Sequence, residues 1–241
     1  MLTKNQIKLI TSLAQKKHRS KYQLFTVEGI KAVQEFLKSS YILEHLYATT
    51  DNFEVDPERF SLITAAELKK ISGLTSAQEV LAVFKIPNAK SVSSERMIVA
   101  LDAVRDPGNL GTIIRLCDWF GVEHIVCSDT TVDCYNPKVV QATMGSLTRV
   151  YVHYLDLPAF LKKTKFPKFG AFMDGANVYD TELPKNGILI MGNEGSGISP
   201  EIEQLISERL SIPSYSVHQS TESLNVATAT AILLSEFRRR G

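Results

Sequence analysis

The stretch MIVALDAVRDPGNLGTIIR (residues 97–115) decides the fold of most of this chain. Its first five residues are apolar, as in a buried strand, and a polar turn then leads into an apolar helix. The same order of strand, polar turn and helix recurs as far as the C-terminus. Such alternation predicts an α/β fold whose parallel sheet is covered by helices on both faces.

The periodicity of apolar residues predicts the elements and the domains of the chain. In a C-terminal domain of residues 96–241 we expect strands at residues 97–101, 125–127, 149–153, 169–173, 188–191 and 210–212, and helices at residues 109–120, 137–144, 157–164, 200–207 and 224–239. In a smaller α/β domain of residues 1–88 we expect helices at residues 3–17, 28–39 and 64–73, and strands at residues 24–27, 45–48 and 80–84. Residues 89–95 are polar without periodicity and are predicted to be a linker.

Composition narrows the class of protein. The 241 residues are 44% hydrophobic and 22% charged, which is typical of a globular protein, and no apolar run approaches the roughly 20 residues of a membrane-spanning helix. The N-terminus lacks the features of a secretion signal. Three cysteines (117, 127 and 134) without C-x-x-C spacing and five scattered histidines indicate no disulfide framework and no metal site. We therefore expect a cytoplasmic protein that binds neither a metal nor a membrane.

The net charge of +1 conceals a basic N-terminus. The first 38 residues contain eight Lys and Arg against two Asp and Glu, and a cluster of cations forms at Lys16, Lys17, Arg19 and Lys21. A solvated helix end would explain such a cluster. A basic leading region on a nearly neutral protein is also typical of nucleic-acid binding.

Three polar or Gly-rich segments follow buried strands, which is where open α/β sheets bind their ligands. In the first, Asn109 is a candidate N-cap and Arg115 lies six residues later, less than two helical turns away. Because neighbours up to Trp119 make this helix largely apolar, we expect Arg115 to share the face directed at the strand ends. Arg binds phosphate bidentately, so a phosphate site is indicated; the alternative is an Arg that only reaches solvent.

The second segment, Gly192-Asn-Glu-Gly-Ser-Gly197, has three glycines within six residues. A turn with positive φ would explain one or two of them, so three indicate a backbone pressed closely against another group. The segment is not a phosphate loop because the lysine is missing, and its spacing differs from the dinucleotide fingerprint.

The third segment joins Ile212-Pro213 to a helix that opens with Ser223-Leu-Asn-Val226 and continues with alternating Ala and Thr. Ser223 and Asn225 are candidate helix caps. A polar loop between a buried strand and a buried helix is also a common place for a functional site.

Together the three segments resemble the SpoU (TrmH-like) family of RNA ribose 2′-O-methyltransferases, in the SPOUT superfamily. The resemblance covers residues 96–238 and rests on Asn109-x-Gly111-x-x-x-Arg115, on Ile190-Met-Gly-Asn-Glu-Gly-Ser-Gly197, and on Ile212-Pro213 followed by Ser223-Leu-Asn-Val226. Lys21-Tyr-Gln-Leu-Phe-Thr-Val-Glu-Gly29 more loosely resembles part of the family's small substrate-binding domain.

The resemblance implies a deep trefoil knot in the C-terminal domain, a homodimer, and methyl transfer from S-adenosylmethionine to a ribose 2′-hydroxyl of RNA. Ribosomal RNA is favoured over tRNA because of the appended N-terminal domain. The implied cofactor-binding residues are Met191, Gly192, Gly197, Ile212 and Leu224. The implied catalytic residues are Arg115 on an RNA phosphate, Asn109, Ser223 and Asn225 orienting Arg115 and the ribose, and Glu194 on the glycine loop or the substrate. RNA would also contact the basic cluster of Lys16, Lys17, Arg19 and Lys21.

One departure and two alternatives qualify this interpretation. Ala142-Thr-Met-Gly-Ser146 replaces the family's commoner Ser-Ala-Gly run, so Thr143 keeps a hydroxyl whereas Met144 is bulkier. The first alternative is a non-catalytic RNA-binding module that retains the fold. The second is a hydrolase using Ser223, but no G-x-S-x-G nucleophile elbow precedes that helix.

Overall fold

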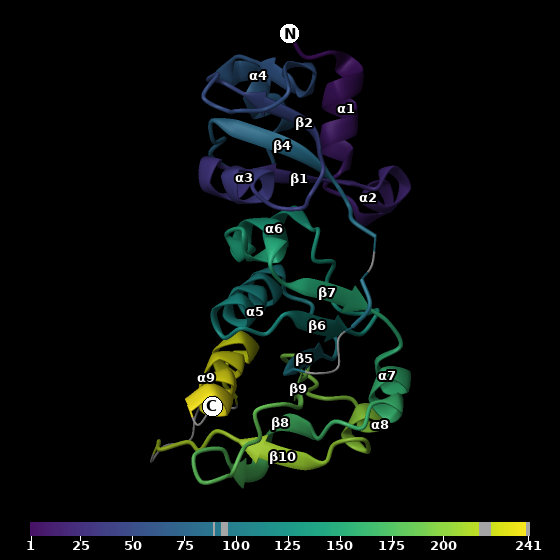
Figure 1. The fold of residues 1–241 in the computed structure, drawn as a ribbon, viewed down its shortest axis with the longest axis vertical. Helices are drawn as coiled ribbons and strands as arrows, with labels where there is room; N and C mark the ends of the chain where they lie inside the picture. Colours follow the sequence, from purple (N-terminus) through teal and green to yellow (C-terminus); the bar gives the residue numbers. More distant parts are fainter. Residues whose placement is uncertain (89, 93–95, 217–222, 240–241) are drawn as a thin grey trace. The chain divides into compact units, whose positions relative to one another are not determined.

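The computed structural model describes residues 1–88, 90–92, 96–216 and 223–239. The chain divides into two compact units, shown with their elements in Figure 1. Unit 1 comprises Met1–Asn88 and Asp133–Thr148, and unit 2 comprises Ala89–Val132 and Arg149–Gly241. The predicted α/β class is confirmed, with a parallel sheet in unit 2 and a small α/β arrangement at the N-terminus.

Unit 1 is built on a mixed four-stranded sheet in the order β1-β4-β2-β3. β4 pairs antiparallel with β1 and β2, and β3 pairs parallel with β2. The elements of its first part are α1 (Lys4–Ser12), α2 (Lys16–Tyr22), β1 (Leu24–Glu28), α3 (Ile30–Leu37), β2 (Leu43–Ala48), a 3-10 turn (Pro57–Arg59), β3 (Phe60–Leu62), α4 (Ala65–Ile71) and β4 (Val80–Lys85).

The N-terminal helix is shorter than predicted. Instead of one helix over residues 3–17, α1 ends at Ser12 and the basic cluster forms its own helix, α2. By contrast, α4 starts at the capping box that the sequence predicts. Thr64 accepts from the backbone N–H of Glu67 at 3.2 Å, and the Glu67 carboxylate accepts from the backbone N–H of Thr64 at 3.0 Å.

Residues 133–148 pack in unit 1 although the sequence predicts them within the C-terminal domain. They contain α6 (Pro137–Thr143) and a 3-10 turn (Ser146–Thr148). The ring of Tyr135 lies 4.7 Å from that of Phe25 on β1, and Asp133 forms a 2.5 Å ion pair with Arg19 on α2. Aromatic packing and a largely buried ion pair therefore hold this segment in unit 1.

Unit 2 contains a six-stranded sheet in the order β10-β8-β9-β5-β6-β7, in which every pairing is parallel. Its elements are β5 (Ile98–Leu101), α5 (Pro107–Trp119), β6 (His124–Cys127), β7 (Tyr151–Tyr154), α7 (Leu157–Lys163), β8 (Lys168–Asn177), β9 (Ile188–Met191), α8 (Pro200–Glu203), β10 (Glu208–Ser211) and α9 (Val226–Arg239). All six predicted strands are present.

Helices cover both faces of the central strands of this sheet (Figure 1). On one face, Ile98 and Ile190 form a buried cluster with Leu161 of α7 and Ile202 of α8. Side chains alternate along a strand, so the intervening residues point to the other face, where α5 and α9 pack side by side. The central strands are fully buried, as the near-continuous apolar runs predict.

Within the described part of the chain, no helix combines the length and the apolar character needed to span a bilayer. The three cysteine side chains are buried.

Candidate active site

The ends of β5 and β9 lie side by side at one edge of the parallel sheet. Leu101 pairs with Met191 in register, and the backbone N–H of Asp102 donates to the carbonyl of Met191 at 2.9 Å. The segments that follow these two strands therefore start next to each other, as expected for a ligand site in an open α/β sheet.

Side-chain hydrogen bonds join all three segments that the sequence singles out. The Asn225 amide donates to Oδ1 of Asn109 at 2.9 Å, and the Asn109 amide donates to Oε1 of Glu194 at 2.9 Å. These bonds bring together the start of α9, the first turn of α5 and the loop after β9. We call this arrangement the Asn–Asn–Glu chain.

Asn225 is also the N-cap of α9, as the sequence predicts. Its Oδ1 accepts from the backbone N–H groups of Ala227 at 2.9 Å and Thr228 at 3.2 Å. Ser223 is exposed and makes no hydrogen bond to a residue that the structure describes. Its side chain is therefore available to a ligand, but no contact ties it to the Asn–Asn–Glu chain.

Asn109 is not the N-cap of α5, contrary to the prediction. The helix begins earlier, at Pro107, and Asp106 caps it by accepting from the backbone N–H of Asn109 at 2.8 Å. Because Asp106 caps the helix, the side-chain amide of Asn109 is free to bridge Asn225 and Glu194.

The glycine loop packs against itself. Asn193 and Gly197 exchange two backbone hydrogen bonds, both of 2.9 Å. A Cβ on Gly192 would lie 2.3 Å from the carbonyl carbon of Gly197, and Gly197 has a φ of +68°. Close backbone approach therefore requires one glycine and the left-handed turn favours another. The predicted close approach is present, but the group approached is the loop's own backbone.

Two residues that sequence reasoning missed, Asp102 and Asn193, anchor this loop. The buried carboxylate of Asp102 accepts from the backbone N–H of Ser199 at 2.7 Å. The Asn193 amide donates to the carbonyl of Ala103 at 2.8 Å, and its Oδ1 accepts from the backbone N–H of Gly195 at 2.9 Å. A carboxylate directly after a buried strand is the sequence signal that could have identified Asp102.

Arg115 lies on the solvent face of α5, and the prediction that it shares the face of the strand ends is wrong for a single chain. Six residues of α-helix separate it from Asn109 by about 9 Å along the axis and about 240° around it. It is exposed together with Thr112 and Trp119, and Trp119 is 84% exposed rather than buried as expected. Arg115 makes no ion pair or hydrogen bond within the part of the chain that the structure describes.

Backbone groups at the site fit the cofactor that the resemblance implies. Gly192, Ile212 and Leu224 make no backbone hydrogen bond to any described residue, and Leu224 is 47% exposed. These groups lie after β9, after β10 and before α9, and backbone donors and acceptors without a partner among the described residues suit a ligand with polar groups on its edge. Met191 is buried beneath them, whereas the backbone of Gly197 is already paired with Asn193.

The basic cluster separates into exposed and buried members. Lys16, Lys17 and Lys21 are exposed on α2. Arg19 is 2% exposed, and besides its ion pair with Asp133 it donates to the carbonyl of Leu13 at 2.8 Å. The prediction that Arg19 contacts RNA is therefore corrected: its guanidinium holds α2 in place.

The departure at residues 142–146 has a structural explanation. Thr143 is buried and its hydroxyl donates to the carbonyl of Val140 at 2.7 Å, so that hydroxyl is not presented to a substrate. Met144 ends α6 in the left-handed region with a φ of +51°. Nowhere in the described ranges do three His, Cys, Asp or Glu side chains come together as metal ligands would.

The α/β architecture with a parallel sheet is that of the SpoU-type methyltransferases. The chain belongs to the SpoU rRNA Methylase family, whose family model matches residues 96–235. An MRM3-like substrate binding domain matches residues 4–82.

Similar proteins extend this assignment along the whole chain. The 23S rRNA (guanosine(2553)-2'-O)-methyltransferase RlmP of Bacillus subtilis (strain 168) is 31% identical over 98% of this chain and 97% of its own. A TrmH-family protein from Porphyromonas gingivalis is 41% identical with a TM-score of 0.91, and each chain is covered completely. An AdoMet-bound rRNA methyltransferase from Sinorhizobium meliloti is 28% identical with a TM-score of 0.88, covering 100% of this chain and 96% of that one.

Proposed function

We propose that this protein transfers the methyl group of S-adenosylmethionine to a ribose 2′-hydroxyl of ribosomal RNA. The Asn–Asn–Glu chain carries the proposal, because its members Glu194 and Asn225 directly neighbour the expected cofactor segments at Gly192 and Leu224 in the sequence. The Bacillus subtilis relative, named for 23S rRNA, matches both parts of the chain, whereas the tRNA (guanosine(18)-2'-O)-methyltransferase of Aquifex aeolicus matches 60% of it. This difference favours rRNA over tRNA.

The adenosine part of the cofactor would be held by the backbone of Gly192, Ile212 and Leu224, with Met191 and Gly197 shaping the pocket. When bound, the cofactor supplies an electrophilic methyl carbon on its sulfonium. The protein then has to align the ribose oxygen with that carbon and exclude competing geometries. Asp102 and Asn193 contribute by holding the glycine loop.

In the reaction, a bond forms between the ribose oxygen and the methyl carbon while the sulfur–carbon bond breaks. The hydroxyl proton must also leave. Arg115 is a poor base because its guanidinium stays protonated, and it lies on the solvent face of α5. It would therefore act from the second subunit of the dimer, where it binds the adjacent RNA phosphate, which assists proton loss. Asn109 and Asn225 orient the ribose with Ser223. Glu194 accepts hydrogen bonds from the side-chain amides of Asn109 and Asn193 and holds both in place.

The protein acts as a homodimer in the cytoplasm, with its C-terminal domain of residues 96–241 knotted and residues 1–88 binding RNA. Trp119, which is 84% exposed, would be covered by the second molecule in such a dimer. The small side chains of α9, which packs beside α5, suit the same interface.

Mapping of 2′-O-methyl groups in total RNA, from cells with and without the gene, tests this function. One rRNA nucleotide should lose its ribose methyl group in the deletion and regain it when the wild-type gene, but not an Asn225→Asp variant, is restored. Restoration by both would show that the hydrogen bond between Asn225 and Asn109 is not needed for methylation in the cell. An unchanged set of rRNA ribose methyl groups would contradict the proposal.

A further inference from the structure

Tyr22 presents an exposed aromatic ring at the end of the basic helix α2. The residue is 42% exposed. Its ring lies nearly parallel to that of His18, with an interplanar angle of 12° and centroids 6.2 Å apart. The Lys21 ammonium lies 5.2 Å from the centroid of the same ring.

His18 acts as a flat support for this ring. Its Nδ1 is buried and has no hydrogen-bond partner among the described residues. The geometry that the structure shows for this imidazole is its near-parallel arrangement with Tyr22.

Helix α2 is fixed firmly enough to hold such a platform. Arg19, on the buried side, donates to Asp133 at 2.5 Å, to the carbonyl of Leu13 at 2.8 Å and to that of Ala14 at 2.9 Å. At the helix end, the Gln23 amide donates to the carbonyl of Ser20 at 2.7 Å. These bonds hold the residues on both sides of Tyr22 before any ligand arrives.

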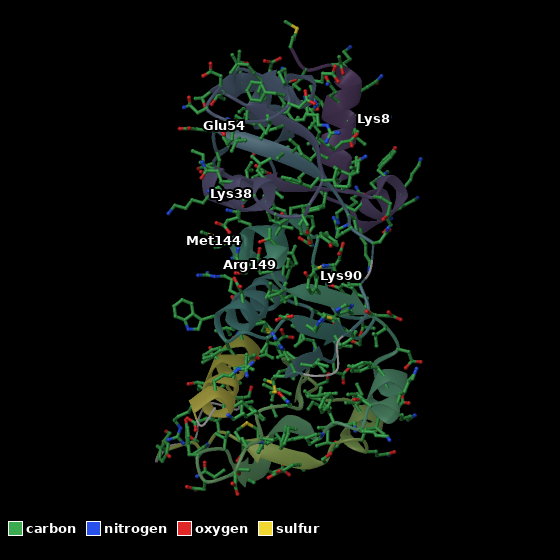
Figure 2. All side chains as sticks on the ribbon, viewed as in Figure 1. Lys8, Lys38, Glu54, Lys90, Met144 and Arg149 are labelled. Atoms are coloured by element: carbon green, nitrogen blue, oxygen red, sulfur yellow. The ribbon has the colours of Figure 1, made fainter. Side chains whose placement is uncertain are left out.

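The surroundings of Tyr22 are strongly cationic. The first 27 residues contain six Lys and Arg and no Asp or Glu. Arg19 is neutralised by Asp133, whereas Lys17 and Lys21 are exposed and form no ion pair with a described residue. Figure 2 labels two further exposed cations of unit 1, Lys8 on α1 and Lys38 at the end of α3. Lys38 lies on the opposite side of the unit from α2 and is not part of these surroundings.

We propose that Tyr22 is a stacking platform for an unpaired base of the substrate RNA, backed by His18, while Lys17 and Lys21 contact the flanking phosphates. The base would replace the weak contact between Lys21 and the ring, which releases the ammonium for a phosphate. Bases in a duplex are already stacked, so the platform selects single-stranded segments such as loops and bulges. This inference rests on the proposed function only in taking RNA as the substrate.

Fluorescence anisotropy of the full-length protein with a labelled, unstructured RNA oligonucleotide, and with the same RNA in a duplex, tests the platform. Tyr22→Ala should weaken single-strand binding about 5- to 100-fold and duplex binding by no more than about twofold. Tyr22→Phe, which keeps the ring, and Ser20→Ala, an exposed neighbour on the same helix, should bind like the wild type. Lys21→Ala should lower the slope of log affinity against log salt by about 1.

Unchanged single-strand affinity of Tyr22→Ala would overturn the platform, as would equal losses for both RNAs or a wild type that binds neither. Methyl transfer to rRNA, measured in the same preparations, separates this outcome from failure of the proposed function. A wild type that binds the oligonucleotide through Tyr22 but methylates no RNA contradicts the enzymatic role alone. A Tyr22→Ala variant that binds RNA normally, beside an active wild type, contradicts the platform alone.

Discussion

The amide of Asn225 donates to the side-chain oxygen of Asn109 at 2.9 Å, across 116 residues of sequence. The same Asn225 side chain caps α9 through the backbone N–H of Ala227. One residue therefore both starts the last helix and fixes the first turn of α5 at the candidate site. Its two roles can be separated by substitution.

Asn225→Asp should keep the helix cap and lose the hydrogen bond to Asn109. A carboxylate accepts from the N–H groups of Ala227 and Thr228 as well as an amide does, but it cannot donate to Oδ1 of Asn109. We expect near-wild-type stability in urea denaturation and a loss of methyl transfer of about tenfold or more, equivalent to about 1.4 kcal/mol. Asn225→Ala should lose the same activity and also about 1 kcal/mol of stability. Full activity of Asn225→Asp would show that the hydrogen bond between Asn225 and Asn109 is not needed for methyl transfer.

Gly192 and Gly195 form a matched pair for testing the glycine loop. A Cβ at Gly192 would meet the backbone of Gly197 at 2.3 Å, whereas the nearest atom to a Cβ at Gly195 is Oδ1 of Asn193 at 3.6 Å. Gly192→Ala should therefore weaken S-adenosylhomocysteine binding, measured by calorimetry, by about tenfold or more, and Gly195→Ala should bind normally. Equal affinities would show that the conformation of the loop does not control the cofactor site.

Arg115→Ala should abolish methyl transfer and leave the rest of the molecule unchanged. Arg115 is exposed and unpaired within the described chain, so its removal should alter the free energy of unfolding by less than about 0.5 kcal/mol. Cofactor affinity should also stay near that of the wild type, because we expect the backbone of Gly192, Ile212 and Leu224 to hold the cofactor, not the Arg115 side chain. Arg115→Lys keeps the charge without the bidentate fork and should be partly active. Normal turnover of Arg115→Ala would exclude this residue from the methyl-transfer mechanism.

Stability should decrease in mild acid because of a buried histidine pair. His124 Nδ1 and His153 Nε2 lie 3.0 Å apart, and burial lowers the pKa of both imidazoles below the usual 6.5. As the pH falls below 6.5, the unfolded chain takes up protons that the folded chain does not, so stability present above this pH is progressively lost.

Urea denaturation between about pH 7.5 and pH 5 measures this loss. His153→Gln, which can still accept or donate a hydrogen bond but cannot ionise, should give a flatter profile over the same range. A wild-type midpoint that rises on acidification would contradict the assignment.

The sheet of unit 2 was predictable because its strands are buried on both faces. A run such as Ile98–Leu101 has no polar residue to place in solvent, so its assignment follows from composition alone. The break between α1 and α2 was not predictable in the same way, since neither Gly nor Pro marks residues 13–15. β3 was missed because Phe60–Leu62 is too short to show a period.

The position of the candidate site could be predicted from the sequence more accurately than the directions of the side chains there. The position of the glycine loop follows from its place after a strand, but its contact with its own backbone depends on three-dimensional packing. Arg19 looked like a surface cation because its partner, Asp133, lies 114 residues away. Arg115 was placed on the wrong face because a helix can be rich in apolar residues and still leave one stripe, with Thr112 and Trp119, in solvent.

The most direct measurement is the transfer of a radiolabelled methyl group from S-adenosylmethionine to purified rRNA and tRNA, followed by alkaline hydrolysis. A 2′-O-methyl group blocks cleavage at its own nucleotide, because the 2′ oxygen is the attacking group. The account predicts label in alkali-resistant dinucleotides from rRNA, and none with Arg115→Ala. Label in mononucleotides, label in tRNA alone, or no transfer by a wild type that binds the cofactor would contradict it.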